Sequence, residues 1–197
     1  MRKGLSIFLI NLLLFACKAP EIQEQEVVWT RELIAESVAQ RIASLDTLPR
    51  LPQDLQAVLP DKWEPFISTE EKTHIPPPDH LYWTEAKKVY FQEDRSFVEI
   101  FLMDYATDEK AVMRLYEKYE SALESEGNKS EVWPEEKASA FAWNWFDQRN
   151  QLHYLEAAVS SRFHIMIRTN LPESQQVLES TWSKLAWKKL EEMGASH

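Results

Sequence analysis

The sequence predicts an α+β fold, a single domain in which a largely antiparallel β-sheet is sandwiched by helices. Two observations predict it. Apolar residues recur at helical spacing near both ends of the chain and once in its middle, whereas the segments between them alternate with a period of two. The turns that separate the alternating segments are short, as antiparallel hairpins require.

The chain begins with a segment typical of a secretory signal. Two cations precede a short apolar run that leads into Ala16 and Cys17. A positive start, an apolar run and a small residue at the cleavage position characterise such signals, and this run is shorter than the about 20 residues of a membrane-spanning helix. We therefore expect residues 1–16 to be a signal peptide that is cleaved between Ala16 and Cys17.

Leu14-Phe15-Ala16-Cys17 resembles the lipobox of bacterial lipoproteins. The resemblance implies a diacylglycerol carrying palmitate-type chains on the sulfur of Cys17, the only cysteine of the chain. Since more than one acyl chain gives stable anchoring, it also implies attachment to a membrane of the bacterial cell envelope through this lipid. Lys18 in the next position implies the outer membrane, facing the periplasm, if the organism has two membranes. The alternative is an ordinary secretory leader followed by an unmodified cysteine.

Residues 17–29 are polar and contain a proline, and we expect them to tether the lipid to one domain of residues 30–197, with its core at about 48–193. The first predicted helix covers 31–45, with Thr30 as its N-cap. We expect a single buried stripe along it, consisting of Leu33, Ile34, Val38, Ile42 and Leu45.

Prolines on both sides limit the next helix to about 53–59. The period of two that follows predicts strands at 63–68, 81–91 and 96–105, and the last two form a hairpin. Apolar side chains of the third strand point to both faces. We therefore expect that strand to be central and covered on both sides.

A further helix is predicted from Thr107 to about 125, and three strands follow. These strands are expected at 138–146, 152–159 and 162–169. Pro172 suits a first helical turn, so we predict one terminal helix from Pro172 to about Met193.

The strands around Ala86-Lys-Lys-Val-Tyr90 and Val98-Glu-Ile-Phe-Leu-Met-Asp-Tyr105, with the strand-turn-strand run to Thr169, carry a second resemblance. Their layout resembles the small secreted or lipidated bacterial proteins of the PsbP/Mog1-like fold class, many of unknown function. The resemblance covers about 48–193 and implies an antiparallel sheet between helices. It implies no catalytic residues, because proteins of one fold serve unrelated roles.

Composition and motifs disfavour several functions. The formal charge of −10, which loss of Arg2 and Lys3 with the leader would lower to −12, repels a phosphate backbone, so we expect no nucleic-acid partner. With three glycines the chain has no phosphate-binding loop, and it has no GxSxG motif. No histidine pair has a metal-binding spacing, so we expect no metal and no cofactor. The hairpin register places His164 opposite position 157, away from His153.

No catalytic residue emerges from the acidic residues or the serines. Acids in adjacent pairs, such as Glu70 with Glu71 and Glu191 with Glu192, diverge on a helix or a strand, as solvated surface residues do. Glu99 and Asp104 differ, because they lie within an otherwise apolar strand. We interpret Asp104, at the strand end, as a contact to the start of the next helix.

Tryptophan is unusually frequent, with eight residues. Four lie on periodic apolar faces and are assigned to the core, namely Trp83, Trp143, Trp145 and Trp182. Four others lie near element ends and are candidate partner contacts, namely Trp29, Trp63, Trp133 and Trp187. The alternative for this second group is that they cap the edges of an aromatic-rich core.

These observations favour a lipid-anchored cell-envelope protein that acts as a non-enzymatic binding or accessory module for a protein or cell-wall partner. The alternative is a small hydrolase or small-ligand carrier whose site converges only in the fold. A cluster of His, Asp or Ser side chains in one pocket would favour that alternative. An exposed apolar patch on an otherwise acidic surface would favour the binding module.

Overall fold

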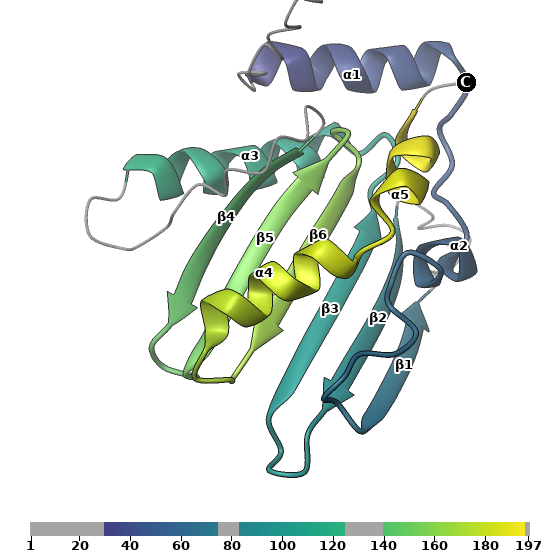
Figure 1. Cartoon of the computed structure of the whole chain (residues 1–197). Coiled ribbons are helices and arrows are strands. Elements are labelled where there is room, and N and C mark those ends of the chain that lie inside the picture. Colours follow the sequence, from purple (N-terminus) through teal and green to yellow (C-terminus); the bar gives the residue numbers. More distant parts are fainter. Residues whose placement is uncertain (1–29, 75–82, 125–139, 196–197) are drawn as a thin grey trace, which may run out of the picture.

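The computed structural model describes residues 30–74, 83–124 and 140–195. Its helices are α1 (Arg31–Ala43), α2 (Pro52–Gln56), α3 (Glu109–Glu124), α4 (Ser174–Lys184) and α5 (Trp187–Gly194). Its strands are β1 (Ser68–His74), β2 (Thr84–Phe91), β3 (Phe97–Asp104), β4 (Ala140–Asp147), β5 (Leu152–Val159) and β6 (Phe163–Thr169). They form one sheet of order β1-β2-β3-β6-β5-β4 in which every neighbouring pair is antiparallel (Figure 1). This confirms the predicted single-domain α+β fold.

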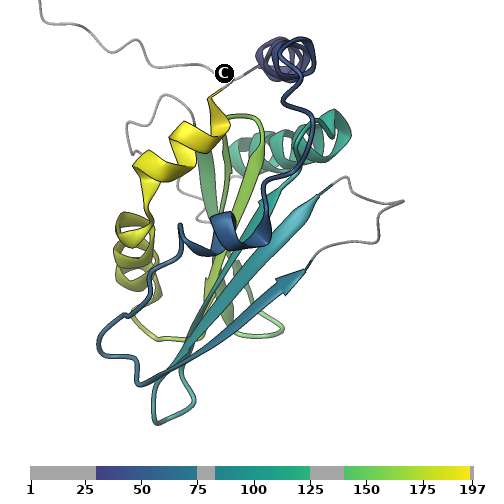
Figure 2. The same ribbon diagram turned by 90° about the vertical axis from the view of Figure 1, so that its right-hand side faces the viewer.

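Helices lie on both faces of the sheet. We call the face under α2, α4 and α5 the front face, toward which Val98 and Ile100 of β3 point, and the opposite one the back face, toward which Glu99 and Phe101 point. On the back, α3 packs against β4 and β5, and α1 packs on α3 (Figure 2). The described helices of this back layer cover only one end of the sheet, and the other end of the back face extends beyond them.

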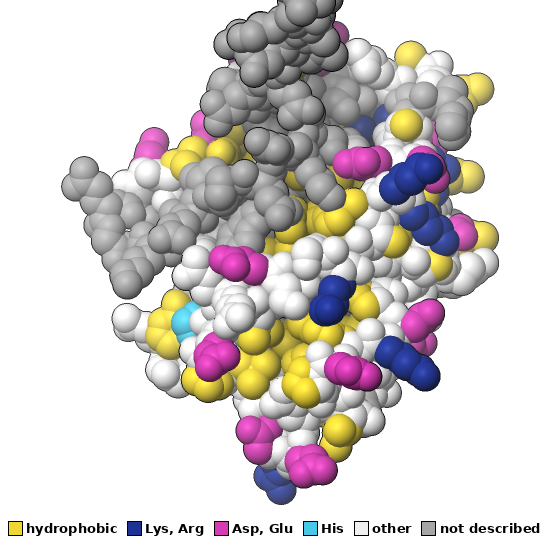
Figure 3. Space-filling view, viewed as in Figure 1, with side chains coloured by type: hydrophobic (Ala, Val, Ile, Leu, Met, Phe, Trp, Pro, Cys, Tyr) yellow, Lys and Arg dark blue, Asp and Glu magenta, His cyan; other side chains and the backbone are white. Residues whose placement is uncertain are grey.

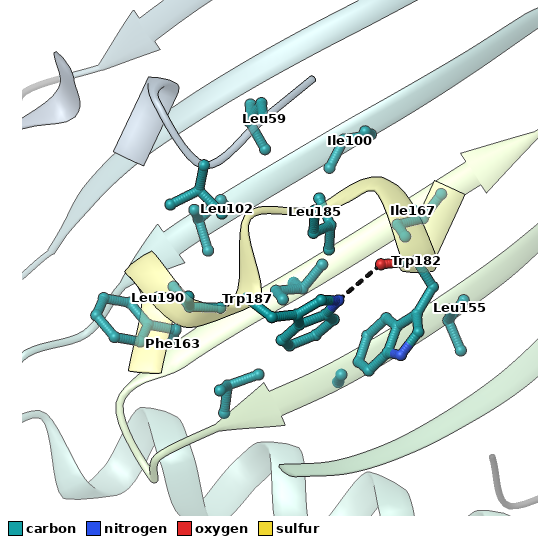
Figure 4. Close-up of a cluster of buried hydrophobic side chains, with 14 of the residues drawn as sticks. Leu59, Ile100, Leu102, Leu155, Phe163, Ile167, Trp182, Leu185, Trp187 and Leu190 are labelled. Carbon is teal, nitrogen blue, oxygen red and sulfur yellow. Dashed lines mark hydrogen bonds between the residues drawn. The ribbon is translucent and has the colours of Figure 1, made fainter. Parts of the chain in front are cut away.

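The front face carries the main core (Figure 4). Alternate residues of the central strands are fully buried because α4 and α5 lie across them. Trp182 and Trp187 pack together with ring centroids 4.2 Å apart, and the indole Nε1 of Trp187 donates a 2.8 Å hydrogen bond to the carbonyl oxygen of Trp182. A smaller core on the back face consists of Ile34, Val112, Leu115, Tyr116, Phe141, Trp143 and Ala158.

Two predicted elements are wrong. The strand expected at 63–68 is a loop in which Trp63 packs against Phe66 and Tyr90, and β1 begins only at Ser68. The predicted single terminal helix is interrupted after α4, because Leu185 adopts an extended backbone and the amide of Ala186 donates to the carbonyl of Val58. This bend lets α5 take a separate course over the front face.

The buried stripe predicted for α1 is wrong at three of its five positions. Ile34 and Val38 are buried as expected, but Leu33, Ile42 and Leu45 are 40%, 52% and 85% exposed. The position that faces inward near the end of the helix is Arg41, which is 1% exposed. Its guanidinium donates to the carbonyl oxygens of Ala106, Ser160 and Ser161, so hydrogen bonds replace apolar packing there.

Candidate functional site on the open half of the sheet

The half of the back face beyond α3 presents a mixed aromatic and charged surface, which we call the open face. It consists of Lys87, Phe97, Glu99, Phe101, Trp145, Tyr154, Glu156, Met166 and Arg168. Most of its apolar side chains are only half-buried, whereas their neighbours Val98, Ile100 and Leu102 on the front are fully buried. β3 is central as predicted, and within the described ranges helices cover its front but not its back.

Glu99 is the centre of an ion cluster on the open face. Arg168 stands directly opposite it on β6, and Lys87 reaches it diagonally from β2. Both cations contact its carboxylate, which is 4% exposed. The Nζ of Lys87 and the guanidinium carbon of Arg168 lie 4.8 and 5.5 Å from the ring centroid of Phe101, close enough for cation–π attraction. The cluster therefore neutralises its carboxylate from within the protein.

Trp145 and Tyr154 form an aromatic pair beside this cluster. They are directly opposite on β4 and β5, and their rings are stacked at 4.1 Å with an interplanar angle of 5°. Trp145 is 37% exposed, so its assignment to the core is wrong. The reason is that α3 shields Trp143 but not the next back-facing position of the strand. Of the two stacked rings, Trp145 supplies the exposed part, because Tyr154 is 8% exposed.

A second buried carboxylate, Glu156, links the aromatic pair to α3. It accepts hydrogen bonds from Nε1 of Trp145 at 2.8 Å and Nζ of Lys118 at 3.3 Å, and Nε2 of His164 lies 3.1 Å away. Burial alone would raise the pKa of Glu156, but His164, then Lys118 and Trp145, outweigh it, so that this pKa lies below its ordinary value. Tyr105 stacks on His164 at 6.2 Å.

The charges of the open face are unequally accessible. The carboxylates of Glu99 and Glu156 are 4% and 3% exposed, whereas the side chains of Lys87, Arg168 and Lys118 are 20%, 31% and 57% exposed. A molecule that touches these residues therefore meets cationic groups and aromatic rings, whereas the neighbouring back-facing positions Glu70 and Glu85 are acidic. The observed feature is thus a difference in exposure, because the two buried carboxylates are hidden while their cationic partners reach solvent.

The histidines do not converge on a catalytic site. His164 stands opposite Ala158, one residue from the predicted position, and points to the back face, whereas His153 lies on the front beside Phe146. Nδ1 of His164 is buried, and no hydroxyl or thiol of the described residues bonds to it, so the Glu156–His164 pair lacks a nucleophile. Within the described ranges, no three His, Cys, Asp or Glu side chains are placed to hold a metal ion.

Asp104 has a structural role that the sequence analysis missed. Its carboxylate accepts two 2.8 Å hydrogen bonds from Arg162, and both side chains are fully buried. Backbone amides of Arg50 and Ala106 donate to it at 2.6 and 2.7 Å. The predicted contact with the start of the next helix is therefore wrong, because the acid binds a buried arginine and the chain that precedes α3.

The two predicted tryptophan contacts that the structure describes are both buried. Trp63 and Trp187 are 6% and 8% exposed and belong to the front core, so these side chains are not available as surface anchors. Trp29 and Trp133 lie outside the described residues, as do Ala16 and Cys17. A signal that could have led to the open face instead is a charged residue within an otherwise apolar strand, as at Glu99 and Arg168.

A groove of about 520 Å³ lies away from the open face, between α2 and the edge strand β1. Its lining includes Gln53, Gln56, Asp61, Glu71 and Thr73. Both polar atoms of the Gln56 amide are buried without a hydrogen-bond partner among the described residues. Among its described lining residues there is no histidine.

Comparison with protein-family models, curated proteins and solved structures finds no match for this chain. The resemblances to the lipobox and to the PsbP/Mog1-like fold class therefore stay predictions. Among the described residues, none of the helices combines the length and apolarity that crossing a membrane demands.

Proposed function

We propose that this protein is a lipid-anchored, non-enzymatic binding module of the bacterial cell envelope, and that the open face binds a protein partner with an acidic and apolar surface. The observation that carries the proposal is the difference in solvent exposure between the acidic and the basic side chains of that face. Glu99 and Glu156 are buried and neutralised, while Lys87, Arg168 and Lys118 remain accessible beside Trp145. Trp, Tyr and Arg are the side chains that most often dominate binding energy in protein interfaces.

Charge complementarity favours an acidic partner that docks in one orientation. The rest of the chain is strongly acidic and would repel such a partner, whereas the open face would attract it. A protein surface fits better than a small molecule, because the described groove lies elsewhere, between α2 and β1. A glycan is less favoured, because Trp145 and Tyr154 stack on each other and leave few ring faces for a sugar.

Anchoring is supported by the lipobox-like Leu14-Phe15-Ala16-Cys17 and by the acidic chain, which anionic headgroups would not hold. The lipid on Cys17 would keep the module near its partner and raise the local concentration. The proposed location is the outer membrane, facing the periplasm, in an organism with two membranes.

The test is site-specific photo-crosslinking in the native envelope. A photoreactive residue at Met166, on the open face, should capture one defined protein, and Trp145→Ala with Arg168→Ala should lower that yield by about tenfold or more. A photoreactive residue at Lys188, on exposed α5, is the matched control and should not capture it. Equal capture from both positions, or capture that survives both substitutions, would refute binding at the open face.

A second candidate, a small-ligand carrier, is favoured by the unpartnered Gln56 amide in the groove. A ligand that offers both a donor and an acceptor would satisfy it. Native mass spectrometry of the purified chain tests this idea. A small molecule that is bound to the wild type and lost in Gln56→Leu would support a carrier, and its absence from the wild type would count against one.

A further inference from the structure

Four apolar side chains protrude at one edge of the molecule, where α1 ends and the chain descends to α2. They are Ile42, Leu45, Leu48 and Leu51, which are 52%, 85%, 70% and 56% exposed, and we call them the apolar ridge. Figure 3 shows separate hydrophobic side chains standing out at the upper right of the molecule, the side on which α1 ends in Figure 1. The ridge recurs every three residues and does not contribute to either core.

The backbone conformation at Leu45 indicates that this leucine side chain does not stabilise the fold. The amides of Leu45 and Asp46 donate to the carbonyls of Ile42 and Arg41 at 3.2 and 3.0 Å, the pattern that closes a helix with a left-handed residue. Leu45 takes that left-handed place with φ of 62°. Glycine or asparagine adopts this conformation at lower free energy than leucine. Neither packing nor backbone geometry therefore explains a leucine here.

We infer that the apolar ridge rests on the surface of the lipid bilayer to which the protein is anchored. This inference deepens the proposed function and depends on lipidation at Cys17. The 13 residues from Cys17 to Thr30 can span at most about 45 Å, and α1 adds a further length of about 20 Å between Thr30 and the ridge. The ridge therefore stays within reach of the membrane.

The charges around the ridge favour contact with acyl chains over contact with headgroups. Arg41 is 1% exposed, and the guanidinium of Arg50 is engaged with the carbonyl of Met193 and with Asp46. The chain as a whole is acidic, so electrostatic attraction to an anionic bilayer is not available. Protruding leucines can insert at the boundary of headgroups and acyl chains, and the tether makes even a weak insertion effective through high local concentration.

This contact would also orient the candidate site. The open face lies toward the end of the sheet that is opposite to α1 (Figure 2). With the ridge on the bilayer, the open face would lie at the end of the sheet that is distant from the membrane, where soluble or assembled partners could reach it.

The test uses the lipidated full-length protein in phosphatidylcholine vesicles that contain nitroxide-labelled lipid headgroups. Mass spectrometry of the N-terminal peptide first establishes whether Cys17 carries lipid. A lipidated Cys17 leaves an introduced cysteine as the only free thiol, so a fluorophore is placed at Thr47→Cys, within the ridge, or at Thr69→Cys on β1. We expect strong quenching at position 47 and little at position 69.

Substitutions then separate membrane contact from folding. Each leucine side chain that no longer inserts into the bilayer should weaken binding of the ridge to the membrane by about tenfold. Leu45→Asn with Leu48→Asn should therefore reduce the quenching at position 47 to the level of position 69. The melting temperature should not fall, because asparagine suits the left-handed backbone at position 45. Ile67→Asn, which removes an apolar side chain that is 65% exposed elsewhere, should leave the quenching unchanged.

The outcomes distinguish the two proposals. Equal quenching at positions 47 and 69 in a chain that carries lipid would overturn the ridge contact and leave the anchoring intact. Absence of lipid on Cys17 would refute the anchoring, and the ridge contact would fail with it.

Discussion

The sheet carries two charged networks that differ in solvent access. At one end, Arg162 binds Asp104 and Asp46, and all three side chains are buried or nearly so. On the open face, Glu99 and Glu156 are buried but their cations reach solvent. The first network joins the chain before α2 to the end of β3, whereas the second leaves charge available for contacts. Similar pairs of residues are thus closed off from solvent in one region and partly open to it in the other.

The largest expected effect comes from breaking the buried network. Arg162→Met removes the partner of a fully buried Asp104, and Asp46 also loses a 2.6 Å contact. An uncompensated buried carboxylate costs about 3–5 kcal/mol, so the free energy of unfolding in urea should fall by about that amount.

A double variant provides the control for Arg162. Arg162→Met with Asp104→Leu leaves neither charge of that pair in the interior and should recover part of the lost stability. If the free energy of unfolding of the single variant falls by less than about 1 kcal/mol, the Arg162 network is as accessible to solvent as the charges of the open face.

Local alternation predicted β2, β3, β5 and β6 closely, because each strand shows its buried face in its own sequence. β1, with the sequence Ser-Thr-Glu-Glu-Lys-Thr-His, has no apolar alternation and is a strand only because it pairs with β2 at the edge of the sheet. The break between α4 and α5 likewise depends on a distant carbonyl, that of Val58.

The candidate site was only partly readable from sequence. Glu99 stood out within an apolar strand, but its partners lie on two other strands and become neighbours only in the sheet. Nothing in the local sequence distinguishes Arg41 and Arg162 from solvent-exposed arginines. Their burial depends on carbonyls and carboxylates from distant segments of the chain. Trp145 was wrongly assigned to the core. The alternation of apolar residues shows which side chains share a face of the sheet, but it does not show where the helix that covers this face ends.

An intermediate effect is expected at Glu156, and it depends on pH. Because the folded-state pKa is lowered, the ionised carboxylate stabilises the fold above its unfolded pKa, and this contribution disappears as pH falls through the folded value. Glu156→Gln should therefore lower the free energy of unfolding by about 1–2 kcal/mol at pH 7.

The pH profile of that variant is the decisive measurement. The stability difference from wild type should shrink as the pH falls through the range in which the carboxylate of the folded protein takes up its proton. Urea unfolding at intervals of pH measures it. A difference that grows as pH falls would mean that Glu156 binds its proton more tightly in the folded state, which contradicts stabilisation by His164 and Lys118.

The smallest effect is expected at Lys118, whose side chain is 57% exposed although it contacts the same carboxylate at 3.3 Å. Solvent screens such a charge, so Lys118→Met should change the free energy of unfolding by less than about 0.5 kcal/mol, and 1 M salt should abolish the difference. Lys110→Met, on the same helix, is the matched control. A loss at Lys118 close to that at Arg162 would remove the distinction between the two networks. A small, salt-sensitive loss would instead mean that Lys118 contributes little to folding, so its charge is available to a partner.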